Sequence, residues 1–161
     1  RDLVRSRGLG DVYKRQDWRR ESLIVCVAVD DNLGMTFNKR RQSQDRVLRE
    51  RLLELTQGRD LWMNSYSVQQ FGSPLPCNII EDNDFLDNAG SHDFCFVENM
   101  PLAKYQNQIE KIILFKWNRV YPADTYFDIP LGSGWTLSST FDFEGSSHIK
   151  ITTEEWICEN I

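Results

Sequence analysis

Apolar positions in this chain fall into short runs separated by polar loops. The first run, residues 22–29 (SLIVCVAV), is continuous and rich in β-branched residues, which predicts a strand buried on both faces. Six further runs of this type predict the remaining strands, at residues 61–63, 78–81, 94–97, 112–117, 134–141 and 148–157.

Helical spacing is clearest where Leu48, Leu52 and Leu55 share one face. It predicts a helix over residues 45–57, with Ser43 as the N-cap and Gly58 ending it. Residues 30–41 read as a polar loop containing Gly34. Shorter helices are predicted at residues 65–71, 84–89 and 101–108, the last with Pro101 at its start. Strands that alternate with helices predict an α/β fold with an antiparallel strand pair at the end.

The first sixteen residues differ in character from the rest of the chain. Residues 11–16 (DVYKRQ) are the translation of GATGTGTATAAGAGACAG, a transposon end used in preparing sequencing libraries. We therefore interpret residues 1–16 as a translated adapter artefact, expected to be disordered, in a metagenomic fragment of bacterial DNA; a natural basic tail is the alternative. Residues 17–161 are then a single domain.

Charge and composition disfavour several classes of function. The first sixteen residues add three positive charges, so the rest of the chain carries a net charge of −8 rather than −5, which makes nucleic acid an unexpected partner. No apolar run approaches the roughly 20 residues that a membrane span needs. Four scattered cysteines, Cys26, Cys77, Cys95 and Cys158, indicate free thiols in a reducing cytoplasm rather than disulfides or zinc. His92 and His148 lack companions at metal-binding spacing, so no metal site is expected.

Residues 111–156 resemble the closing third of a dihydrofolate reductase. Asp124–Phe127 stand where that family has an acidic-Thr-aromatic-aromatic turn, Gly134 and Trp135 where its next strand starts, and residues 148–156 where its final strand lies. Earlier segments are similar in the same order. The resemblance implies a dihydrofolate reductase-like fold, in which a mostly parallel mixed central sheet is flanked by helices and ends in an antiparallel strand pair.

The same resemblance argues against the activity of that family. A glycine pair that lets the backbone approach the cofactor pyrophosphate is here Glu98-Asn99. The Gly-Arg/Lys-x-Thr/Ser start of the second helix is here residues 64–67 (NSYS), in which Ser67 is the candidate cofactor contact that remains. Loss of tight NADPH binding follows, and no cofactor is expected.

The substrate side of the family site is altered as well. No Pro-Trp pair precedes the first helix, and Phe115 replaces the strand threonine that supports the pterin. Asp45 is a candidate for the family's catalytic carboxylate. Counting back from Gly58 places Leu48 nearer to that position, and Asp45 then serves the helix N-terminus.

Charged residues at the end of the first strand and before the first helix suggest a different site. Arg40 and Arg41 precede a helix N-terminus, where the helix dipole disfavours cations and free backbone amides favour anions. Carboxyl ends of strands in open α/β sheets are also where ligands bind. We expect one cleft formed by Asp30, Asp31, Asn38, Arg40, Arg41, Gln42, Ser43 and Asp45. The alternative is a structural network in which arginines pair with the aspartates.

A second polar and aromatic cluster covers residues 117–122, where Arg119 either stacks on Trp117 or Tyr121 or lies in a solvated loop. Residues 29–45 also resemble short bacterial proteins that carry the label ribonuclease Z. That enzyme is a zinc hydrolase with an HxHxDH motif, and a chain with two histidines cannot supply it.

Three functional hypotheses remain. The first is a fold relative that is not a reductase and binds a small anionic ligand or a protein partner through the residue 30–46 cleft. The second is a divergent NADPH-dependent reductase that holds a nicotinamide or flavin in an altered way. The third is a purely structural or interaction domain.

Overall fold

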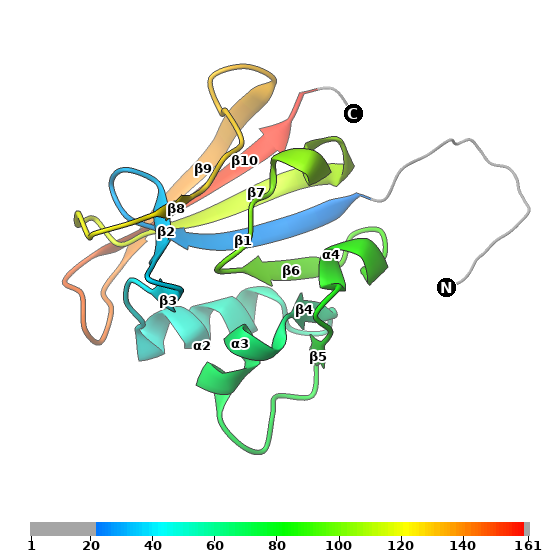
Figure 1. Cartoon of the computed structure of the whole chain (residues 1–161), viewed down its shortest axis with the longest axis horizontal. Coiled ribbons are helices and arrows are strands. Elements are labelled where there is room, and N and C mark those ends of the chain that lie inside the picture. Colours follow the sequence, from blue (N-terminus) through cyan, green and yellow to red (C-terminus); the bar gives the residue numbers. More distant parts are fainter. Residues whose placement is uncertain (1–21, 160–161) are drawn as a thin grey trace, which may run out of the picture.

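A seven-stranded sheet organises residues 22–159, the part of the chain that the computed structural model describes, so the predicted artefact at residues 1–16 lies outside the described residues. Its strand order is β5-β4-β6-β1-β7-β10-β9 (Figure 1). The parallel strands are β1 (Leu23–Val29), β4 (Leu61–Met63), β5 (Ile79–Glu81), β6 (Phe94–Val97) and β7 (Ile109–Lys116). The antiparallel strands are β10 (Ile151–Cys158) and β9 (Trp135–Phe143). The predicted α/β fold with a closing antiparallel pair is confirmed.

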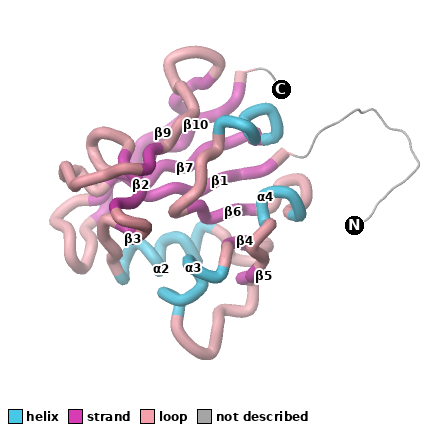
Figure 2. Tube along the Cα trace, viewed as in Figure 1, coloured by secondary structure: helices cyan, strands magenta, loops and turns pink. Residues whose placement is uncertain are grey.

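Strand β1 lies in the middle of the sheet, between β6 and β7, and is buried on both faces as predicted. Val25 and Val27 face one apolar cluster, which α4 (Phe85–Asn88) and the 3₁₀ helix η2 (Ala103–Gln108) help to cover. Ile24 and Cys26 face the other cluster, which helix α2 (Arg46–Leu55) covers. Helices therefore cover the middle of the sheet on both faces (Figure 2), while the edge strand β9 (Trp135–Phe143) stays largely exposed.

Helix α2 begins one residue later than predicted, and its N-cap is Asp45 rather than Ser43. The Asp45 carboxylate accepts hydrogen bonds from the backbone amides of Val47 and Leu48, which satisfies two free donors of the first turn. At the other end the helix stops at Leu55 with Thr56 as its C-cap, before Gly58.

The shorter helices lie close to their predicted positions. Helix α3 (Ser65–Val68) continues into the 3₁₀ helix η1 (Gln69–Phe71), and α4 forms as expected. The helix predicted from Pro101 is instead the 3₁₀ helix η2, which begins at Ala103. His148 and its two successors precede β10, so the last strand starts later than predicted.

Residues 30–41 were predicted to be a polar loop, and this prediction is wrong. They contain β2 (Gly34–Phe37) and β3 (Arg40–Arg41), which pair with β8 (Thr125–Tyr126) in a small second sheet. Asn38 and Lys39 have positive φ angles of 51° and 64°, the conformation of a tight hairpin turn, although neither residue is glycine. Gly34 is required because an added Cβ would lie 2.6 Å from the Ala123 Cβ atom.

None of the helices in the described range is long and apolar enough to cross a membrane. The four cysteines have free thiols, of which Cys26 and Cys95 are buried and Cys77 is exposed.

Replacing Phe115 with Ala should lower the free energy of unfolding by about 3–5 kcal/mol, the usual cost of removing a fully buried aromatic ring. Guanidinium unfolding measures the change. Ile149→Ala is the matched control because this side chain is 90% exposed, and its effect should stay within about 0.5 kcal/mol. A loss below about 1 kcal/mol for Phe115→Ala would contradict the assigned core.

The thiols should differ sharply in reactivity. Burial raises the pKa of Cys26 to about 12 and raises the pKa of Cys95 as well, so neither forms a thiolate near neutral pH. An aromatic disulfide reagent should modify Cys77 rapidly in the native protein and should reach Cys26 and Cys95 only in denaturant. Cys77→Ser should remove the rapid modification at that position, and the half-buried Cys158 should react more slowly than Cys77. Rapid modification of Cys26 or Cys95 would show that the sheet opens.

Candidate functional site

A small cleft opens at the carboxyl end of β1, where open α/β sheets bind their ligands. It has a volume of about 200 Å³, including space open to solvent. The enclosed part of this space is only about 10 Å³, room for about one water molecule, so the cleft admits at most a small group of a ligand. Its lining residues are Ala28, Met35, Arg41, Gln42, Ser43, Glu98 and Trp117.

A buried ion pair between Arg41 and Glu98 crosses the cleft. The Arg41 Nε and Nη2 atoms donate to the two Glu98 carboxylate oxygens at 2.9 and 3.1 Å, and the two side chains are 19% and 7% exposed. Burial alone would lower the pKa of Arg41, but the hydrogen bonds and negative charge of Glu98 outweigh it and raise that pKa. Arg41 also lies over the Tyr66 ring, 4.4 Å from its centroid. The pair therefore joins β3 to the end of β6.

The two segments that the family resemblance assigns to cofactor phosphates are bonded to each other. The Ser67 hydroxyl donates to Glu98 at 2.8 Å, and the Asn64 amide donates to the Asn99 side-chain oxygen at 3.0 Å. Asn64 also caps α3 by accepting from the Ser67 backbone amide. Side chains thus fill the space between the end of β6 and the start of α3.

Asp30 anchors the loop on the other side of the cleft. Its buried carboxylate accepts from the backbone amides of Asn32, Gly34 and Tyr121 and from the Gln42 side-chain amide. Burial would raise the pKa of Asp30, but these four hydrogen bonds hold it below its ordinary value. The Gln42 side-chain oxygen is buried and has no hydrogen-bond partner among the described residues.

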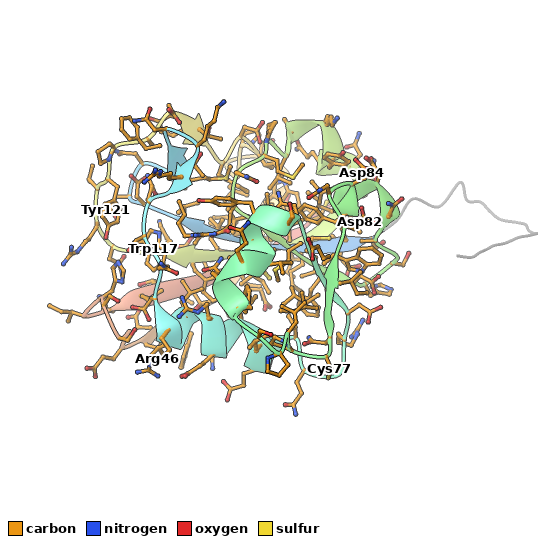
Figure 3. All side chains as sticks on the ribbon, turned by 60° about the horizontal axis from the view of Figure 1, so that its bottom comes forward. Arg46, Cys77, Asp82, Asp84, Trp117 and Tyr121 are labelled. Atoms are coloured by element: carbon orange, nitrogen blue, oxygen red, sulfur yellow. The ribbon has the colours of Figure 1, made fainter. Side chains whose placement is uncertain are left out.

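Asp45 and His148 form a second buried cluster beside the cleft. His148 Nδ1 lies 3.1 Å from an Asp45 carboxylate oxygen, while Nε2 lies 3.2 Å from the Ser43 hydroxyl and 3.0 Å from the Tyr121 hydroxyl. The imidazole stacks on Trp117 with ring centroids 4.4 Å apart. In Figure 3, Trp117 and Tyr121 lie on the same side of the molecule as Arg46, the first residue of α2.

The Asp45 carboxylate is fixed in its ionised form. Burial would raise its pKa, but hydrogen bonds hold the pKa well below its usual range. The donors are the backbone amides of Val47, Leu48, Ser146 and Ser147, the Ser146 hydroxyl and the His148 ring.

The eight predicted site residues divide into three groups. Arg41, Gln42 and Ser43 line the cleft. Asp30 and Asp45 are buried beside it and hold its walls in place. The other three are exposed and do not line it: Asp31, Asn38 and Arg40.

The Arg–Asp pairs of the network hypothesis do not form among the described cleft residues, since Arg41 pairs with Glu98 and Asp30 with Gln42. Arg119 is exposed, and Trp117 stacks on His148. Sequence reasoning missed Glu98 and His148 as members of this site. They lie 57 and 105 residues from Arg41 and Ser43 respectively, so no local motif links them.

Comparison with solved structures identifies the architecture. The structure is similar to that of dihydrofolate reductase from Enterococcus faecalis in complex with NADP(H) and RAB-propyl, with a TM-score of 0.62 and 10% sequence identity. The match covers 86% of this chain and 97% of that one, so the chain has a dihydrofolate reductase-like fold. No model of a known protein family and no curated protein sequence matches this chain.

Replacing Arg41 with Ala should cost about 3–5 kcal/mol of unfolding free energy, because the Glu98 charge would stay buried without its partner. Chemical denaturation measures the loss. Arg46→Ala is the matched control, since Arg46 pairs with Glu50 where both side chains are more than 60% exposed, and it should change stability by less than about 1 kcal/mol. Equal effects of the two variants would contradict a buried pair.

Proposed function

We propose that this dihydrofolate reductase-fold protein is not a functional dihydrofolate reductase and that it binds a small anionic ligand, or a protein partner, through the cleft at Arg41. The observation that carries the proposal is the place of Glu98. Its carboxylate is held at the end of β6 by Arg41 and Ser67, where the family resemblance implies bare glycine backbone against a pyrophosphate. A fixed negative charge at that point repels a phosphate.

One group of the cleft, the Arg41 Nη1 atom, remains available to a ligand. Arg41 uses Nε and Nη2 on protein acceptors, whereas Nη1 has no partner among the described residues. The Gln42 side-chain oxygen is an unpaired acceptor. That oxygen is buried, so a ligand would reach it only after the side chain moved, whereas an acidic group on a small molecule would satisfy Arg41 directly.

Two other candidate functions stand beside this one. A structural or interaction domain is favoured by the Arg41–Glu98 pair, which already neutralises the main cation of the cleft. A divergent reductase would need NADPH to displace the hydrogen bonds between Ser67 and Glu98 and between Asn64 and Asn99.

Titration with NADPH separates the reductase from the other candidates. We expect no change in melting temperature and no quenching of tryptophan fluorescence up to millimolar NADPH, because a ligand stabilises a protein only in proportion to its binding. Trp117 lines the cleft and makes the fluorescence a local probe. Micromolar binding would overturn the proposal and make the chain a divergent reductase.

An anion panel tests the proposed ligand class with the same readouts. Small hydroxy acids with a single negative charge should raise the melting temperature of the wild-type chain, whereas inorganic phosphate, which Glu98 repels, should not. Arg41→Gln should abolish that shift, measured relative to its own melting temperature, and the exposed Arg46→Gln should keep it. An equal shift in both variants would indicate general screening rather than a site.

A further inference from the structure

The cleft contains a second set of reactive groups that the proposed ligand binding does not use. We propose that Ser43 and His148, with Asp45 as a positioning residue, form an acyl-transfer centre that hydrolyses small esters. This inference rests on the proposed function only in that it uses the same cleft.

The three side chains make the connected pair of hydrogen bonds that such a centre requires. Asp45 bonds His148 Nδ1 at 3.1 Å, and His148 Nε2 meets the Ser43 hydroxyl at 3.2 Å. Because Asp45 is an ionised acceptor, Nδ1 must donate to it, so the lone pair of the neutral ring lies on Nε2. Nε2 can therefore remove the hydroxyl proton of Ser43, the arrangement of a serine nucleophile with its base.

The base is held in one orientation before any substrate arrives. The side chains of His148 and Asp45 are only 3% and 0% exposed, and Trp117 stacks on the imidazole ring. Asp45 is fixed in turn by the amides of the α2 N-terminus and of the loop before β10. Such support from surrounding groups keeps a reactive constellation within the geometry it needs.

The Ser43 nucleophile is accessible from the cleft, whereas the His148 base is buried. Ser43 is partly exposed and lines the cleft, and Arg41 supplies a cation to the same cleft. The small volume of the cleft limits the acyl group to a short one.

The reaction balances with water as the only co-reactant. The Ser43 oxygen bonds to the ester carbonyl carbon while its proton moves to His148 Nε2. The ester C–O bond then breaks, and the leaving alkoxide takes that proton as an alcohol. Water attacks the acyl-serine with Nε2 again accepting a proton, and the carboxylic acid leaves as Ser43 regains its hydrogen.

Tyr121 sets the resting state of this centre. Its hydroxyl lies 3.0 Å from Nε2, slightly closer than the Ser43 hydroxyl, and one lone pair cannot serve both donors fully. Removing the Tyr121 hydroxyl should leave Nε2 to Ser43 alone. In a purely structural cluster, this change would remove one hydrogen bond and would not increase the reactivity of Ser43.

The test uses the full chain, a fluorophosphonate probe and p-nitrophenyl acetate. We expect one covalent adduct per chain, located at Ser43 by peptide mass spectrometry, and its loss in Ser43→Ala. Ser133→Ala is the matched control, since Ser133 is an exposed serine in the loop before β9, away from this cluster, and it should label at the wild-type rate.

Two further variants test the roles of the neighbours. Tyr121→Phe should label at least as fast as wild type, and Asp45→Asn should label at least 100-fold more slowly because the imidazole loses its orientation. If Asp45→Asn does not fold, the Ser43 and Tyr121 variants decide the question. An unlabelled Ser43, or labelling that survives Ser43→Ala, overturns the inference.

The outcome is separable from that of the anion experiments. Labelling of Ser43 in a protein that responds to no anion would overturn the proposed ligand class and support acyl transfer. Anion binding that depends on Arg41, with an inert Ser43, would support the ligand site and overturn acyl transfer.

Discussion

The Asp45 carboxylate is the contact on which this end of the molecule depends. It starts α2, closes the loop before β10 and orients His148, so parts of the chain about 100 residues apart meet on two oxygen atoms. The loop comes so close that a Cβ atom at Gly145 would lie 2.5 Å from Asp45 Oδ2. The same hydrogen bonds hold the pKa of Asp45 below its ordinary value, which favours the ionised carboxylate.

A second carboxylate, Glu98, determines the opposite wall of the cleft. A buried charge is stable only with a partner and further hydrogen bonds, and Arg41 and Ser67 supply both. The pair ties β3 to β6 and narrows the space between them. The architecture is similar to that of a solved reductase structure, and in this chain the side chains of Arg41 and Glu98 line the cleft.

The sequence predicts what depends on neighbouring residues and misses what depends on distant ones. Apolar runs place β1, β4 and β6 well because burial on both faces leaves a continuous pattern. The choice between Ser43 and Asp45 as N-cap cannot be made locally, since both side chains accept hydrogen bonds and the loop containing Ser146 favours Asp45. The partners of Arg41 and Ser43 cannot be predicted from the sequence either, because only the folded sheet brings them together.

The Ser43 hydroxyl is the detail that a stabilising role does not explain. In a network built only for stability, one hydroxyl beside His148 Nε2 is enough, and that of Tyr121 already lies 3.0 Å from it. The Ser43 hydroxyl is a second partner, 3.2 Å from His148 Nε2, and Ser43 lines the cleft. It is partly exposed, so water can satisfy its hydroxyl without help from His148. A redundant contact between an accessible hydroxyl and a fixed base contributes little to folding, whereas it is the contact that activates a nucleophile.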